Sequence, residues 1–178
     1  MLGPRVRHDG AMSYFTAVLA SDGDGWRSVD LEVEEVADVD ELADEVRSAV
    51  DGSDLDGAGP LLVVIEREDD WFALVRVDGE EPRAFVSDLG AATSSRYADL
   101  LSVTADAPAP QPAPQDDEEE DSAARVAAPT WAGDAELLAD LELPGSELTE
   151  TAESRDPAGA LVAVGERLGF VDLLEALR

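Results

Sequence analysis

Carboxylates dominate the reactive side chains of this chain, whereas the usual catalytic nucleophiles and metal ligands are scarce. The sequence has 42 Asp and Glu against 12 basic residues, all of them Arg, with one His and no Cys. His8 lies near the N-terminus, before the first patterned segment, so a Ser-His-Asp arrangement has no suitably placed base. Zinc sites of the usual kind need His and Cys ligands. The sequence therefore predicts no catalytic residue, no cofactor and no metal site.

Carboxylate chemistry stays open as an alternative because acids are so abundant. Paired carboxylates can act as general acid and base, but in such an acidic chain clusters also arise by chance and face solvent. The loops at 22–25 and 51–57 are rich in Asp and Gly, yet both lack the spacing and the terminal Glu of a calcium-binding EF-hand. Turn formation accounts for both loops. A carboxylate-based, metal-dependent enzyme remains the more remote alternative.

The net charge of −30 limits which partners the protein can bind. Contacts with nucleic-acid phosphates need Lys and Arg, so direct binding of DNA or RNA is not expected. The same charge repels anionic membranes, and no apolar run reaches the length of about 18 residues that a spanning helix needs. Long-range attraction favours a basic protein partner. Solubility alone is the competing explanation for the charge.

Alternating apolar residues and short turns predict an antiparallel sheet in the first half of the chain. Asp38 stands three residues before Glu41, which resembles a capping box and predicts that a helix starts there and runs to residue 50. A disordered leader at 1–13 is expected before the sheet, and a second helix through Leu101 after it. The predicted strands form one hairpin and one three-stranded meander, at 14–20, 26–33, 61–65, 71–77 and 83–87.

Composition changes sharply after this region. Residues 104–130 are rich in Ala and Pro and contain the acidic run at 116–121, so they cannot bury enough surface to fold and predict a disordered linker. Helical patterns resume at 131–178, where Asp156-Pro157 marks a helix start and Gly169 a helix stop. The expected fold class is α+β: an antiparallel-sheet domain at 14–103 with two helices in the order ββαβββα, an acidic linker, and a small all-helical module.

The Arg and aromatic residues of the sheet domain are the candidates for an interaction site. Arg76 and Arg83 lie on neighbouring predicted strands, and Arg96 follows them in the chain. In an acidic chain these Arg residues are expected to form salt bridges. The more specific alternative is that they form a pocket that binds a carboxylate or a phosphate. Trp71 and Phe72 are adjacent on one strand, so they face opposite sides; we expect a helix to cover the one outside the main core, with an exposed contact residue as the alternative. The candidate interaction residues are Trp71, Arg76, Arg83, Arg96 and Tyr97.

Several motifs together resemble one protein family. They are the apolar run 61–66, the strands at 71–79 and 83–88, the helical segments 156–170 and 174–178, and the pair Tyr14-Phe15. These motifs resemble the tRNA adenosine deaminase-associated proteins of high-GC Gram-positive bacteria, over most of 12–102 and 133–178. The resemblance implies a cytoplasmic protein without known activity, and it carries over no catalytic or binding residue. The deaminase itself needs His or Cys zinc ligands and a catalytic Glu in a tight motif, which this chain lacks.

These observations lead to one functional hypothesis and one alternative. We expect a non-catalytic, acidic accessory or adaptor protein of the cytoplasm that binds a basic protein partner. The family resemblance names the tRNA adenosine deaminase, which converts the wobble adenosine to inosine, as that partner. The alternative is a small-anion sensor that uses the Arg residues of the sheet domain. The sequence does not indicate the oligomeric state.

Overall fold

A computed structural model describes residues 14–51, 54, 59–67, 69–79, 81–102 and 129–178. The predicted leader and most of the predicted linker lie outside these residues. The described residues form a six-stranded antiparallel sheet with the strand order β2-β1-β3-β4-β5-β6. Its strands are β1 (Tyr14–Ser21), β2 (Trp26–Val29), β3 (Leu61–Arg67), β4 (Trp71–Val77), β5 (Arg83–Val86) and β6 (Ala132–Gly133).

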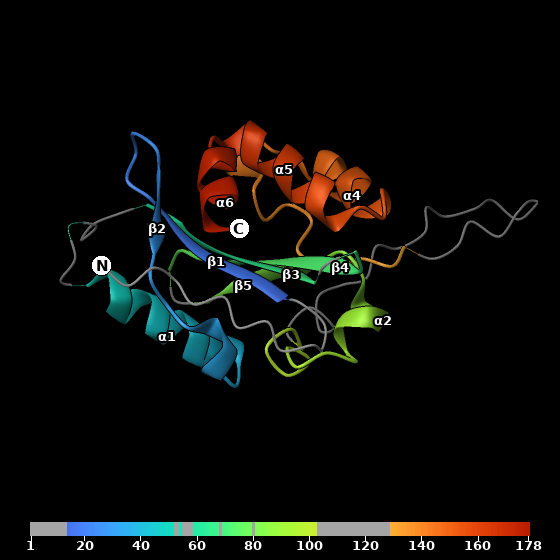
Figure 1. The fold of residues 1–178 in the computed structure, drawn as a ribbon, viewed down its shortest axis with the longest axis horizontal. Coiled ribbons are helices and arrows are strands. Elements are labelled where there is room, and N and C mark those ends of the chain that lie inside the picture. The colour runs from blue at the N-terminus through green and yellow to red at the C-terminus, as the bar shows by residue number, and fades with distance from the viewer. Residues whose placement is uncertain (1–13, 52–53, 55–58, 68, 80, 103–128) are drawn as a thin grey trace, which may run out of the picture.

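The sheet is the middle layer of three, because helices cover both of its faces (Figure 1). The helices α1 (Val39–Val50) and α2 (Leu89–Ala92) lie on one face, together with the short 3-10 helix η1 (Val33–Glu35). The helices α4 (Gly145–Glu153), α5 (Pro157–Leu168) and α6 (Val171–Leu177) lie on the other. The predicted α+β class and its ββαβββα order are therefore confirmed.

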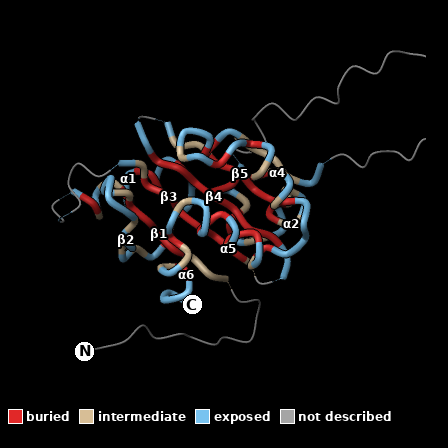
Figure 2. Tube along the Cα trace, turned by 90° about the horizontal axis from the view of Figure 1, so that it is seen from above, coloured by how far each residue is buried: buried red, intermediate tan, exposed pale blue. Residues whose placement is uncertain are grey.

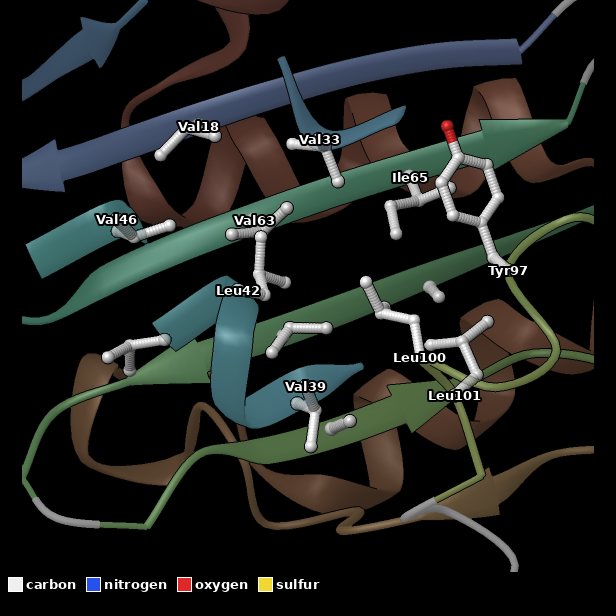
Figure 3. Packing of buried hydrophobic residues seen from close by; sticks show 14 of the residues in the cluster. Val18, Val33, Val39, Leu42, Val46, Val63, Ile65, Tyr97, Leu100 and Leu101 are labelled. Carbon is white, nitrogen blue, oxygen red and sulfur yellow. The ribbon is translucent and has the colours of Figure 1, made fainter. Parts of the chain in front are cut away.

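The first face is closed by α1, whose start is fixed by its own side chains. The Asp38 carboxylate accepts a hydrogen bond from the Glu41 backbone N–H at 2.8 Å, and the Glu41 carboxylate accepts one from the Ala37 N–H. The Asp38 bond is the predicted cap and satisfies a backbone donor that the first helical turn leaves unpaired, while the return bond of the box reaches Ala37, the residue before the cap. The helix thereby turns Leu42 and Val46 onto the sheet, where they pack against apolar side chains that include Val63 and Ile65 of β3 (Figure 3).

The second predicted helix is much shorter than the apolar spacing suggested. It ends at Ala92 instead of Leu101, and residues 93–102 form successive turns. The Ser95 hydroxyl donates to the Ala92 carbonyl at 2.6 Å and accepts from the Tyr97 N–H at 3.1 Å. Such side-chain bonds compete with helical backbone bonds, which explains the break. The expected apolar residues are still buried, because Tyr97, Leu100 and Leu101 fold back onto the first core cluster.

The second face is closed by the C-terminal residues, which also add a strand that the sequence did not predict. β6 pairs with β5 through Val86–Ala132 and Phe85–Gly133. Gly133 has a φ of +100°, and a Cβ at this position would collide with the Ala84 carbonyl oxygen, so only glycine fits. The apolar spacing of Leu137, Leu138 and Leu141 predicts a helix at 135–141 after Asp134, and this is wrong: these residues form turns and the 3-10 helix η2 (Ala139–Leu141).

The last two helices follow their predicted start and stop signals closely. The Asp156 carboxylate caps α5 by accepting from the Gly159 N–H at 3.0 Å, Pro157 occupies the first turn, and Gly169 ends the helix with a left-handed φ of +84°. The Trp26 indole N–H donates to the Leu168 carbonyl at 2.8 Å, which joins β2 to the end of α5. None of the described helices combines the length and the apolarity that crossing a bilayer requires.

The central strands have apolar side chains on both faces, and these form two separate core clusters. Every residue of β4 is buried (Figure 2). Val63 and Val75 belong to the cluster under α1, whereas Leu62 and Leu74 belong to the cluster under the C-terminal helices. The segment predicted as a separate helical module therefore packs directly on the sheet domain. The division of the chain at 104–130 into two units stays a prediction.

We expect Phe170→Ala to lower the free energy of unfolding by about 3–5 kcal/mol. Phe170 is fully buried and packs edge-to-face on Trp26, with ring centroids 5.4 Å apart. The matched control is Leu177→Ala, at a residue with a relative exposure of 44%, which should change stability by less than about 0.5 kcal/mol. Urea unfolding followed by far-UV circular dichroism and Trp fluorescence measures both. Because sheet and helices share a core, the two signals should change together, and an early transition seen only in the helical signal would contradict this.

Candidate functional site

The structure divides the five candidate interaction residues between the two faces of the sheet. Arg76 of β4 and Arg83 of β5 are partners across the sheet, on the face that the C-terminal residues cover. Trp71 and Tyr97 are buried on the opposite face, where the Tyr14 ring makes edge-to-face contacts with both. Neither can touch a partner in this arrangement. Arg96 is exposed, and its guanidinium lies 6.0 Å from the centroid of the Tyr97 ring.

Helical segments cover both members of the Trp71-Phe72 pair. Trp71 is fully buried among the residues of the first core cluster, which include the turns that follow α2. Phe72 points the other way and lies in the second cluster with residues of α4, α5 and α6. The expectation that the second aromatic would lie under a helix is thus confirmed, and the alternative of an exposed contact residue is not.

Arg76 is a buried cation that belongs to the internal structure of the protein. Its side chain is only 4% exposed and donates to the Leu137 carbonyl and to both carboxylate oxygens of Asp140, with the Nη2–Oδ2 distance at 2.7 Å. The Asp78 carboxylate lies 2.6 Å from the same guanidinium. The neighbouring Arg83 pairs with Asp134 at 3.1 Å. The expectation that Arg76 and Arg83 form salt bridges is confirmed, and both pairs tie the sheet to the residues that follow β6.

The protonation equilibria reflect this pairing. The hydrogen bond from Arg76 holds the pKa of the Asp140 carboxyl below its usual value, although partial burial opposes the shift. The same bond raises the pKa of Arg76. An external carboxylate or phosphate would have to displace Asp140 or Asp78 from a guanidinium that is already neutralised. The arrangement therefore gives no support to the alternative of an anion sensor built on Arg76.

A third ion pair on the same face was not anticipated from the sequence. Glu66 is 5% exposed and accepts a hydrogen bond from the Arg178 guanidinium, which also lies 5.3 Å from the centroid of the Phe15 ring. The sequence pattern could have predicted a buried carboxylate here. Glu66 follows Leu62 and Val64 at a spacing of two residues, so it shares their face of the strand. A carboxylate on a buried face requires a cation, and Arg178 supplies it.

A cavity of about 300 Å³ lies beside the β3–β4 turn, and Arg76, Arg83 and Arg96 do not line it. Four parts of the chain line it. They are the β3–β4 turn with the start of β4, the residues after β5, Thr130, and the end of α4 with its connection to the start of α5. Four of the lining residues carry carboxylates and one carries a guanidinium. The lining residues are Asp69, Asp70, Phe72, Ser87, Asp88, Thr130, Thr151, Ala152, Arg155, Asp156 and Pro157.

Local structure explains why these carboxylates converge. Asp88 caps α2 by accepting from the Ala91 N–H at 2.9 Å, as Asp156 caps α5, so two helix starts bring one carboxylate each to the cavity. Asp70 pairs with Arg67 at 2.9 Å in the β3–β4 turn, and Asp69 adopts a left-handed φ of 60° there. Among the residues that the structure describes, no three His, Asp or Glu side chains lie close enough to hold a metal ion. The sequence indicated Asp156 as a helix cap and left Asp88 or Ser87 as the cap of the helix before it, but it could not bring Asp88 and Asp156 together.

We expect Asp140→Asn to lower the free energy of unfolding by about 1–3 kcal/mol at pH 7, because it weakens the neutralisation of the buried Arg76. A carboxyl with a depressed folded-state pKa contributes its stability above the unfolded pKa, about 3.9 for Asp, and loses it as the pH falls through the folded value. The difference between wild type and variant should thus be constant above about pH 5 and shrink below about pH 4. Urea denaturation from pH 3 to 7 measures it.

The control for this variant is Glu175→Gln, which removes the same charge from an exposed position on α6. Its stability should differ from wild type by less than about 0.5 kcal/mol across the range. If the two variants gave the same pH profile, the Arg76–Asp140 pair would contribute nothing specific.

Comparison with known proteins places the chain in a family. The sequence model described as Rv3753c-like tRNA adenosine deaminase-associated protein matches residues 14–171. No curated protein and no solved structure matches the chain. The matched range runs from the first residue of β1 to the first residue of α6, so it includes the whole sheet, the Arg76–Asp140 pair and the cavity. The chain belongs to the family of Rv3753c-like tRNA adenosine deaminase-associated proteins.

Proposed function

We propose that this protein is a non-catalytic, acidic accessory protein of the cytoplasm that binds the tRNA adenosine deaminase and regulates it. The family description names the deaminase, and the charge arrangement supports a basic partner. The observation that carries the proposal is the contrast between cations and anions on the molecule. Arg76, Arg83 and Arg178 are engaged by the protein's own carboxylates, while most of its acids face outward.

The outer side of α1 is one place where carboxylates are exposed to solvent. The helix exposes four carboxylates on the side away from the sheet, and its one cation, Arg47, pairs with Asp44 at 3.2 Å. The Arg47 guanidinium also donates to the Gly79 carbonyl. Uncompensated carboxylates produce a negative potential that speeds encounters with a positive surface. The exposed acids of α1 are Asp40, Glu41, Asp44 and Glu45.

A deaminase that binds tRNA must present a basic surface, because phosphate contacts are made by Lys and Arg. An acidic protein could dock on that surface and compete with tRNA, or dock elsewhere and change turnover. The first mode raises the apparent KM for tRNA, and the second changes kcat. Deamination itself needs a zinc-activated water and a catalytic Glu, so the reaction would belong to the partner.

The proposal predicts association that depends strongly on salt. Mixing the purified protein with the deaminase at about 50 mM salt should give a complex, whose affinity falls by about tenfold or more near 300 mM as screening increases. Titration calorimetry measures the binding, and wobble-adenosine deamination in the same mixtures measures the regulation. An unrelated protein of similar net charge is the control and should bind more weakly. Absence of association at low salt would refute the proposal.

A further inference from the structure

We propose that the outer edge of β1 at residues 14–17 is a docking site for an extended, basic segment of a partner protein, which adds to the sheet as a further strand. For the existence of a basic partner this inference rests on the proposed function, and it adds where and how the partner is held. β1 pairs with β3 along 14–20, but it pairs with β2 only along 18–21. We call the stretch 14–17, where β1 has no described strand on its β2 side, the open edge.

The direction of the backbone groups determines what the open edge offers to a partner. In an antiparallel ladder, successive residues point their N–H and C=O groups to opposite sides of the strand. The Ser21 N–H donates to the Pro60 carbonyl on the β3 side at 3.2 Å, so residues at an odd spacing from Ser21 point away from β3. On the open edge these residues are Tyr14 and Thr16, and no backbone group of the described residues pairs with them on that side. An added strand would form ladder hydrogen bonds with both.

The chain leaves the sheet at the point where this pairing would continue. If β2 ran on in register, Leu31 would stand opposite Thr16 and Val33 would stand opposite Tyr14. Instead, Leu31 packs against the core cluster under α1, and Val33 is buried in that cluster and begins η1. Both residues are thus used on the face of the sheet, and they do not serve as a partner strand for the open edge.

Partly exposed apolar side chains lie beside the open edge, on the face that the C-terminal helices cover. Phe15 is only partly buried, and the Arg178 guanidinium lies over its ring. Leu177, the residue before Arg178, is the one large apolar side chain that is exposed among the residues described. A strand on the open edge would place every second side chain over Phe15, on the side where Leu177 is exposed, and so remove apolar surface from water.

The neighbouring edge of β2 is much less suited to pairing. β2 is four residues long, and its exposed Arg27 pairs with Asp22 at 2.7 Å. Short edge strands with charged side chains disfavour the addition of another strand. The open edge carries no charged residue, and its Tyr, Phe and Thr residues are typical of strands.

The charges near the open edge favour a basic segment. The two guanidiniums there are neutralised by the protein itself, because Arg178 donates to Glu66 and Arg67 pairs with Asp70. Exposed carboxylates follow β2 where the chain leaves the sheet, and others lie on α6. A second copy of this chain would bring a further net charge of −30, so repulsion disfavours the pairing of two open edges. The exposed acids are Asp30, Glu32, Glu35, Asp172 and Glu175.

The first experiment tests the open edge without any protein partner. An end-blocked heptapeptide of alternating Arg and Val is titrated into the full chain, and amide hydrogen exchange is followed by NMR. In the free protein the Thr16 amide should exchange rapidly, whereas the Phe15 amide, which points to β3, should exchange slowly. The peptide should slow exchange at Thr16 by at least about tenfold and leave Ser28, which points outward from β2, unchanged. The same peptide with every backbone amide N-methylated keeps its charge but has no ladder donors, and it should bind at least about tenfold more weakly.

Three results of this experiment would overturn the proposal. Equal binding of the N-methylated peptide would mean that charge alone holds the peptide. Protection of Ser28 in place of Thr16 would move the site to β2. Slow exchange of Thr16 in the free protein would mean that the edge is already occupied, by a second copy if the protection rises with protein concentration and by the chain's own residues if it does not.

The variant Thr16→Pro removes the outward N–H without removing a hydrogen bond to β3, and Pro is tolerated where an edge strand points its N–H away from the sheet. The matched control Ser28→Pro makes the same change on the outer edge of β2. Both variants should keep the circular dichroism spectrum of wild type. The Arg-Val peptide should bind Thr16→Pro at least about tenfold more weakly and Ser28→Pro like wild type. Equal affinity for the two variants would overturn the site, and if Thr16→Pro does not fold, the exchange measurement on wild type decides.

The second experiment links the open edge to the proposed partner. The deaminase should bind Thr16→Pro at least about tenfold more weakly than wild type and Ser28→Pro like wild type, because only the first variant blocks strand addition. If the deaminase does not bind wild type but the peptide protects Thr16, the proposed partner is wrong and the docking site stands. If the deaminase binds wild type and Thr16→Pro alike, the docking site is wrong and the proposed function stands.

Discussion

The two-sided burial of the central strands is the constraint on which the rest of the structure depends. β3 and β4 carry apolar side chains on both faces, so neither face can be left to water. α1 and the turns after α2 cover one face. Among the described residues, it is those beyond the predicted linker that cover the other face. The C-terminal helices are therefore required by the sheet, whatever else they do.

Ion pairs then fix how the C-terminal residues sit on that second face. Arg76, Arg83 and Glu66 all lie on it, and each pairs with a residue of the C-terminal segment. Apolar contact alone sets no unique register, whereas a buried charge left without its partner is strongly unfavourable. The pairs thus favour one docked arrangement. β6 adds backbone pairing at the edge of the sheet, at a point where only Gly133 allows the chains to approach.

Elements whose physical cause is local were predictable from the sequence. The strand Trp71–Val77, the Asp38–Glu41 capping box and the Asp156-Pro157 helix start depend on neighbouring residues alone, and they lie where expected. β6 is two residues long and has no pattern of its own, so no sequence signal could reveal it. The helix after Asp88 is shorter than predicted, because Ser95 offers the backbone a competing hydrogen bond. The cavity beside the β3–β4 turn joins residues from separate segments of the chain, and only the fold brings them together.

Net charge and local shape have different roles in choosing a partner. A charge of −30 attracts any basic protein, so it raises encounter rates without selecting among partners. Selection needs a place where the right partner satisfies groups that a wrong partner leaves unsatisfied. Arg76 and Arg83 cannot provide it, because the fold already uses them. On this basis the acidity of the chain explains how a basic protein is drawn to it, and selection among such proteins needs further contacts.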